Sequence, residues 1–208
     1  LAAIDYLKIK GGKKFSVNNL ELARHFYSDK PEGNWKPETI LKNKSILILG
    51  PGSGIKKYQS VIESFIENTQ PYVIALNTQS NVRQELINVR AACHPMRLLS
   101  DFHEHINLPQ PLITPYTMLP SNLKEEFSSK EILNFGVKIN NQGFSFYKNY
   151  CEIPKSLVIA YAIAIANSGK AEEILLAGFD GYGHEDPRRK EMDQLIENYK
   201  NTLDSIPI

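Results

Sequence analysis

The sequence predicts an α/β protein with a doubly wound, mostly parallel sheet and helices on both of its faces. Short apolar runs at 46–49, 72–76 and 173–177 are typical of strands buried in a parallel sheet. Segments with helical spacing separate these runs, and this alternation favours a parallel sheet. Glycines follow the first and last runs directly, at Gly50 and Gly178. Sharp turns are therefore expected where the strands end.

The stretch 44–60, KSILILGPGSGIKKYQS, contains the first glycine-rich turn. Gly50, Gly52 and Gly54 allow the backbone to turn sharply and to approach a ligand closely, and an amphipathic helix is predicted over 55–67. A strand, a glycine turn and a helix together offer backbone N–H groups and a positive helix end to an anion. The same glycines would also suit a tight turn with no ligand.

Two common nucleotide motifs are absent from this stretch. The dinucleotide fingerprint would need glycine at Ile55, and the phosphate loop of ATPases would need glycine there and Ser or Thr at Lys57. The sequence therefore does not favour NAD binding or ATP cleavage of the P-loop type.

The composition is that of a globular protein with one full-sized core: 208 residues, of which 42% are hydrophobic and 23% charged. The longest apolar run, 157–166, is shorter than the roughly 20 residues of a membrane span, and no secretory signal is found. A cytoplasmic protein without a membrane span is therefore expected. Cys93 and Cys151 are expected to be buried free thiols in a reducing compartment.

The net charge is +1, but residues 1–44 carry nine Lys or Arg against five Asp or Glu. Because these basic residues are scattered, they favour a solvated face, and no nucleic-acid partner is expected. Residues 1–43 are predicted to be a helical N-terminal extension and linker, with 31–43 leading to a domain at 44–208. The chain begins at Leu1, without methionine, which suggests part of a longer polypeptide.

The remaining elements follow the same alternation. Strands are predicted at 87–93 and 111–116, and helices at 95–102, 121–127, 155–168 and 188–203. The aromatic-rich segment 133–154 is predicted to hold one strand and an irregular loop over the ligand side. In the last helix, the predicted inner face is Met192, Leu195, Ile196 and Tyr199.

Polar residues follow two of the predicted strands. Asn77 comes directly after one strand, at the edge where open α/β sheets bind ligands, although Asn is also common in turns. The segment after the last strand carries Asp180, Tyr182 and His184. Asp180 could also cap a turn, with His184 exposed to solvent. If both strands are parallel, the two glycine-rich segments open onto one cleft.

The phrase ILILGPGSGI and the later SLVIAYAIAIANSGKAEEILLAGFDGYGHEDP resemble the bacterial sialyltransferases of glycosyltransferase family 42, from about Lys44 to the end. This resemblance implies a Rossmann-like domain that binds a nucleotide sugar. Those enzymes transfer sialic acid from CMP-sialic acid to a surface glycan without a metal. No metal and no cofactor besides the CMP-sugar, as substrate or ligand, are expected here.

The resemblance also implies roles for individual residues. His184 matches the general base that takes the proton of the acceptor hydroxyl, and Tyr182 matches a tyrosine that hydrogen-bonds the leaving phosphate. The residues implied in nucleotide binding are Gly50, Pro51, Gly52, Ser53, Asn77 and Ser156, and Asp180 is predicted to join them from its place after the last strand. The family has a mobile lid between the tyrosine and the histidine. Since Tyr182 and His184 are nearly adjacent here, the sequence departs from the family at this point.

The first 43 residues, with NVRAACHPMRLL and LPQPLITP, resemble the C-terminal region of bacterial proteins that begin with a TIM-barrel aldolase. Those barrels are related to 4-hydroxy-2-oxovalerate aldolases and HMG-CoA lyase. The resemblance implies an aldolase barrel in the same polypeptide as a partner. The alternative function is then a non-catalytic accessory domain of such a lyase, in surface-polysaccharide metabolism. The sequence leaves a homo-oligomer open.

A weaker hypothesis makes Cys93 a nucleophile with His94 or His103 as its base. Adjacent residues of a strand point to opposite faces, so Cys93 and His94 are poorly placed to pair. His103 and His105 are also spaced badly for a metal site on a helix.

Overall fold

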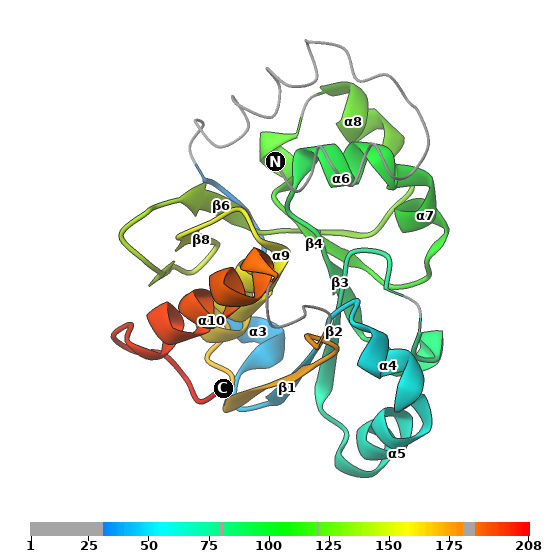
Figure 1. Ribbon diagram of the computed structural model, residues 1–208. Helices are drawn as coiled ribbons and strands as arrows, with labels where there is room; N and C mark the ends of the chain where they lie inside the picture. Colours follow the sequence, from blue (N-terminus) through cyan, green and yellow to red (C-terminus); the bar gives the residue numbers. More distant parts are fainter. Residues whose placement is uncertain (1–30, 80, 120, 181–185) are drawn as a thin grey trace.

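A computed structural model describes residues 31–79, 81–119, 121–180 and 186–208 (Figure 1). Its centre is a six-stranded sheet with the order β5-β4-β3-β2-β1-β9, in which all neighbouring strands are parallel. The strands are β1 (Ser45–Leu49), β2 (Tyr72–Leu76), β3 (Val89–Ala91), β4 (Leu112–Thr114), β5 (Ile132–Asn134) and β9 (Glu173–Ala177). The prediction of a parallel α/β sheet is confirmed.

Helices cover both faces of this sheet (Figure 1). Alternate side chains of β1 enter two separate clusters: Ile46 and Ile48 pack with the residues of α9, whereas Leu47 and Leu49 pack with Ile66 of α5. The helices are α3 (Glu38–Leu41), α4 (Ser53–Lys57), α5 (Gln59–Thr69), α6 (Pro95–Ser100), α7 (Phe102–Asn107), α8 (Ser121–Glu126), α9 (Val158–Ser168) and α10 (Pro187–Lys200). Single helical turns occupy Gln84–Leu86 and Tyr116–Met118.

Two helices that were predicted as continuous are each divided in two. The helix expected over 55–67 is interrupted at Tyr58, and the one expected over 95–102 ends before Asp101, where α7 follows. Both residues have φ near −110° and ψ near 20°, outside the helical range. Pro95 does begin its helix, as predicted, because the first helical position needs no N–H donor.

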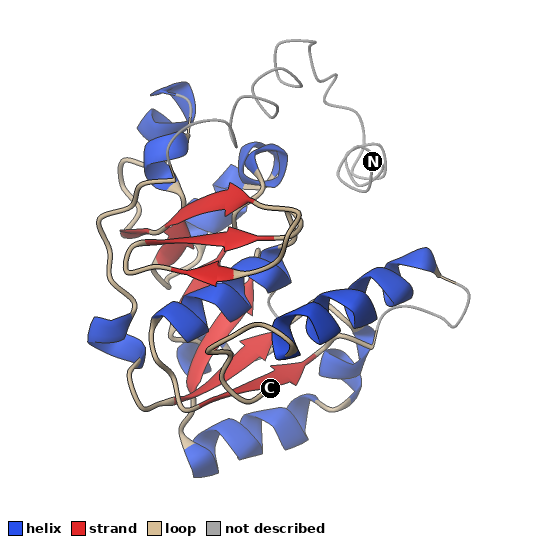
Figure 2. Ribbon diagram, turned by 90° about the vertical axis from the view of Figure 1, so that its left-hand side faces the viewer, coloured by secondary structure: helices blue, strands red, loops and turns tan. Residues whose placement is uncertain are grey.

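The largest difference from the prediction is a second sheet within 133–154. In place of one strand and an irregular loop, β5 is followed by β6 (Gly136–Ile139), β7 (Ser145–Phe146) and β8 (Tyr150–Ile153). These last three form their own sheet, with β8 between β6 and β7. In Figure 2 the side of the molecule that carries β6 and β8 faces the viewer. The segment is thus a structural layer, and its loop-like composition was misleading.

Aromatic packing explains why this segment is rich in Phe and Tyr. The rings of Phe144 and Phe146 lie 5.5 and 6.1 Å from the ring of Tyr199 in α10. The Tyr161 hydroxyl of α9 donates to the carbonyl of Phe135 over 2.5 Å. Helix α9 contacts both this sheet and strands β2 and β3, and its residues 159–167 are all buried. The prediction that this helix is buried on most sides is confirmed.

The last helix packs as its spacing predicts. Leu195 and Tyr199 are buried, and Met192 and Ile196 are partly buried against the same core. The Tyr199 hydroxyl donates to Asn167 Oδ1 of α9 over 2.8 Å.

Strand β9 was predicted to be buried but lies at the edge of the sheet, with only Ile174 buried.

Residues 31–43 pack against the strands that follow. The N–H groups of Asn34 and Trp35 donate to the carbonyl of Asn134, and the Asn149 side chain donates to the carbonyl of Gly33 over 2.6 Å. Leu41 in α3 is fully buried. The connection predicted at 31–43 is therefore part of the packed structure. Most of the predicted extension, residues 1–30, lies outside the described residues, so the boundary at 43 and 44 stays a prediction.

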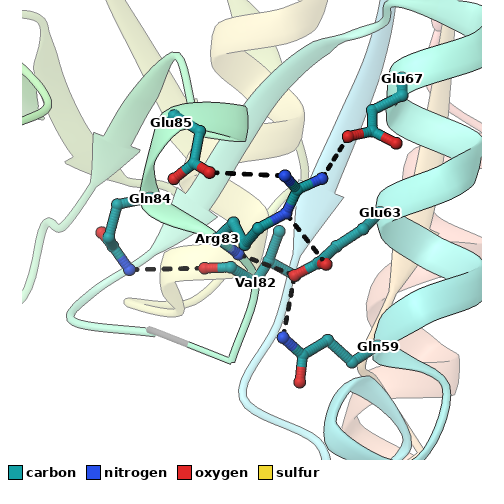
Figure 3. A network of polar contacts seen from close by, with 7 residues as sticks. All are labelled: Gln59, Glu63, Glu67, Val82, Arg83, Gln84 and Glu85. Carbon is teal, nitrogen blue, oxygen red and sulfur yellow. Dashed lines mark hydrogen bonds and ion pairs between the residues drawn. The ribbon is translucent and has the colours of Figure 1, made fainter.

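The segment between β2 and β3 is held from two sides. On the outer side, Arg83 pairs with Glu63 and Glu67 of α5 and with the neighbouring Glu85, while Gln59 donates to Glu63 (Figure 3). The Gln59 amide and the Arg83 contacts together lower the pKa of Glu63. Such pairs near the surface stabilise a fold weakly.

On the inner side, the same segment is held by Arg90 of β3. Its side chain is fully buried and donates to Gln110, to Gln84 and to the carbonyls of Asn77 and Gln79. Burial lowers the pKa of Arg90 to about 10, so the guanidinium stays charged at neutral pH. Arg90 therefore fixes the backbone that follows β2.

Candidate functional site

The two glycine-rich segments meet at one end of the sheet. Strands β1 and β9 are parallel neighbours, paired from Ser45 with Glu173 to Leu49 with Ala177, so Gly50 and Gly178 follow them at the same edge. Strands β2 to β5 lie on one side of β1 and β9 lies on the other. This is the topological switch point, outside which open α/β sheets bind ligands. The predicted placement of the two segments at one edge is confirmed.

The two segments also bond directly to each other. The N–H of Gly50 donates to the carbonyl of Ala177 over 2.8 Å, and the N–H of Gly52 donates to that of Gly178 over 2.7 Å. These bonds continue the pairing of β1 with β9 beyond the strands.

The side chain of Asp180 completes this contact. Asp180 Oδ2 accepts from the N–H of Gly54 over 2.8 Å and lies 3.3 Å from the Ser53 hydroxyl. The carboxylate thus lies at the start of α4, where the N–H groups of a helix have no partner within it. Asp180 thus caps helix α4, whereas the structural role considered from the sequence was the capping of a turn.

Close contact accounts for the glycines of the first turn. A Cβ atom at Gly52 would lie 2.5 Å from Asp180 Oδ1 and from the Gly178 carbonyl, and one at Gly50 would lie 2.9 Å from the Phe179 ring. Gly178 itself has φ of +79°, which side-chain-bearing residues rarely adopt. From the sequence, these glycines were expected to let the backbone approach a ligand closely. In the structure, the group that lies close to them is the segment after β9.

A cavity opens beside this contact. Its volume is about 360 Å³, within the range of small-molecule sites. The lining residues come from the end of β9 and from α10: Phe179, Asp180, Arg189, Met192 and Asp193. The wall therefore combines an aromatic ring and a thioether with two carboxylates and one guanidinium.

Ser156 lies two residues before α9, and its binding of a nucleotide stays a prediction. The far end of α9 is tied to the start of β1, because the N–H of Asn43 donates to Lys170 over 3.0 Å and that of Glu172 donates to Lys44 over 2.9 Å. Helix α9 spans about 16 Å, so its first residues, which follow Ser156, lie that far from this contact with the start of β1. Lys155, one residue earlier, contacts Glu191 of α10 over 2.7 Å.

Asn77 follows β2, the strand next to β1, at the predicted edge. It is buried and has φ of +52°, a left-handed conformation that Asn tolerates better than most residues. Its N–H donates to Ala91 and its carbonyl accepts from Arg90. The turn role that the sequence left open is therefore real, and contact of its side chain with a nucleotide stays a prediction.

The two residues predicted to be catalytic, Tyr182 and His184, lie outside the described residues. Pro51, between the first two glycines, is exposed. The structure thus brings Gly52 and Ser53 into contact with Asp180 and places Gly50 against Ala177 and Gly178. Nucleotide binding by these residues stays a prediction.

Four cavity residues were not among the predicted site residues: Phe179 after β9, and Arg189, Met192 and Asp193 of α10. The last three lie on one helix, where Met192 and Asp193 follow Arg189 by three and four positions, and Met192 was predicted to face inward. A signal was therefore present for these three, because residues three and four positions apart are neighbours on a helix surface.

The thiol hypothesis receives no support from the structure. Cys93 is fully buried, and burial raises the pKa of its thiol to about 12, so a thiolate is disfavoured. His103 is exposed, whereas Cys93 is in the core. Cys93 and Cys151 are both buried free cysteines, as predicted.

Within the described ranges, no cluster of three His, Cys, Asp or Glu side chains suits a metal ion. In the same ranges, no helix is long and apolar enough to cross a membrane.

Comparison with solved structures finds chains with a similar fold. The MAf glycosyltransferase of Magnetospirillum magneticum AMB-1 superposes with a TM-score of 0.50 at 17% identity, over 81% of this chain and 28% of that one. The chain thus has a glycosyltransferase-like fold. It spans less than a third of that relative's length. No family model and no curated protein matches the sequence.

Proposed function

We propose that this chain binds a nucleotide sugar at the β1 and β9 edge, as part of a glycosyl transfer. The observation that carries the proposal is the cavity of about 360 Å³ at the switch point of a glycosyltransferase-like fold. In such folds the crevice beyond the strand ends is the usual ligand site. The ligand class proposed from the sequence is a CMP-sugar, and sialic acid is the sugar that the resemblance implies.

The chemistry proposed for the transfer needs no metal. His184 would take the proton of the acceptor hydroxyl, because an imidazole near its ordinary pKa can act as a base at neutral pH. Tyr182 would donate a hydrogen bond to the departing phosphate, which stabilises its developing charge. Both residues follow Asp180 closely in the sequence.

Binding is tested by thermal unfolding with CMP, UDP, GDP and ADP and their sugars. Cytidine ligands should stabilise the fold by about 2.7 kcal/mol at one hundred times their dissociation constant. Met192→Trp, which fills the cavity, should abolish the stabilisation, whereas Gln194→Trp on the exposed side of α10 should retain it. If no cytidine ligand shifts the transition of the unmodified chain, the proposal is wrong.

Turnover is tested separately with His184→Ala. The variant should lose transfer from the CMP-sugar to an acceptor while its affinity for CMP stays within about twofold, because a general base acts on the acceptor. Equal turnover in the variant would refute this role. Binding without transfer by the unmodified chain would favour the non-catalytic accessory domain.

A further inference from the structure

We propose that the cavity between the end of β9 and α10 binds a vicinal diol of a sugar, with the carboxylates of Asp180 and Asp193 as hydrogen-bond acceptors. This inference rests on the proposed function and specifies which part of the ligand the cavity receives. The diol belongs either to the ribose of the nucleotide or to the sugar attached to it.

The first step concerns the backbone donors of the first glycine turn. The N–H groups of Gly50, Gly52 and Gly54 already donate to Ala177, to Gly178 and to the Asp180 carboxylate. A phosphate at the start of α4 would have to displace this carboxylate. These three donors are therefore already engaged by the protein's own acceptors, which disfavours this turn as the site of a ligand's phosphate.

The second step concerns the charge around the cavity. Asp180 and Asp193 contribute two negative charges, and Arg189 contributes one positive charge. Among the described residues that line it, the sum is thus negative. A phosphate would be repelled by the two carboxylates, whereas a neutral polyol meets no such repulsion.

The third step concerns shape and hydrogen bonding. A pyranose or furanose ring presents apolar C–H groups on its faces and hydroxyl groups at its rim. Phe179 and Met192 offer apolar surface for a ring face, and the Asp180 and Asp193 carboxylates offer acceptors for hydroxyl donors. The position of Asp180 at the cavity wall is fixed, because its Oδ2 contacts Gly54 and Ser53.

The test compares CMP, 2′-deoxy-CMP, a CMP-sugar and free hexoses by calorimetry or NMR titration. The variant is Asp193→Asn, which keeps the size of the side chain and removes its charge. Glu197→Gln is the matched control, since Glu197 is exposed on the same helix and does not line the cavity. Asp180 is left unchanged because it caps α4.

If the ribose supplies the diol, CMP should bind about tenfold more tightly than 2′-deoxy-CMP, and Asp193→Asn should remove the difference. If the attached sugar supplies it, CMP and its deoxy form should bind equally. The CMP-sugar should then bind about tenfold more tightly than CMP, again only with Asp193 present. Glu197→Gln should reproduce the unmodified chain.

The experiment distinguishes a failure of the diol site from a failure of the proposed nucleotide binding. If cytidine ligands bind and Asp193→Asn changes no affinity, or if inorganic phosphate competes for the cavity, the diol site is wrong and the nucleotide proposal stands. If no nucleotide binds but free hexoses do, with loss in Asp193→Asn, the diol site stands alone. Binding of neither class overturns both.

Discussion

Replacement of Arg90 by alanine should lower the free energy of unfolding by about 3–5 kcal/mol. The side chain is fully buried and is held by hydrogen bonds of 2.7–3.1 Å to Gln110, Gln84, Asn77 and Gln79. Its removal leaves buried carbonyl oxygens without a donor and opens a cavity beneath the segment that follows β2. The lost hydrogen bonds and the cavity both lower the free energy of unfolding, because solvent in the core cannot compensate for either.

Urea unfolding of Arg90→Ala, Arg90→Lys and Arg83→Ala tests this. Arg90→Lys should be almost as damaging, because an ammonium cannot reproduce the fork that spans several acceptors. Arg83 is the matched control: its side chain is 43% exposed and pairs with Glu63 and Glu67, so Arg83→Ala should cost no more than about 1 kcal/mol. Equal losses in Arg90→Ala and Arg83→Ala would contradict the structural role assigned to Arg90.

Arg90 also shows what the sequence could not reveal. In NVRAAC the arginine stands among apolar residues, so the strand was predictable from its neighbours. Its four acceptors come from residues before and after the strand, and only the folded backbone brings them together. Charged residues are seldom fully buried, so a solvent-facing position was the natural expectation.

The parallel strands and the meeting of the glycine segments were predictable because local signals specify them. Apolar runs mark β1, β2 and β9, and glycines mark the turns that follow β1 and β9. The position of a strand within the sheet is not specified by the residues of that strand. Strand β9 has the apolar composition of a central strand, yet it lies at the edge. The second sheet was missed because its strands are two to four residues long, too short for a clear alternation.

The candidate site was predicted in part for the same reason. Gly52 and Asp180 were recognised from their places after strands, yet their direct contact depends on the pairing of β1 with β9. Arg189 and Asp193 enter the site only because α10 packs back over the end of β9. Sequence patterns identify which residues follow each strand, whereas helix packing decides which of them share a cavity.

Acidification from pH 6.5 to pH 4 should destabilise the protein through His105. This residue of α7 is fully buried, and neither ring nitrogen has a hydrogen-bond partner. The pKa of His105 is lowered to about 4, mainly by burial; Asp101 opposes this shift, and Arg90 and Lys130 contribute to it. In the unfolded chain the pKa is about 6.5. Below that value the unfolded state takes up a proton that the folded state does not, so stability falls as pH falls.

The loss attributable to His105 should reach about 3 kcal/mol at pH 4, measured by urea unfolding at several pH values. His105→Phe should leave stability at pH 7 nearly unchanged, because no hydrogen bond of the ring is lost, and should flatten the acid slope by this amount. A residual dependence of stability on acid pH should remain because of His94. Burial, followed by the charge of Arg97, lowers the pKa of His94 to about 4. His103→Gln, at an exposed position, is the control and should keep the full slope. If His105→Phe unfolds in acid as steeply as the unmodified chain, the imidazole of His105 is not kept neutral by its burial.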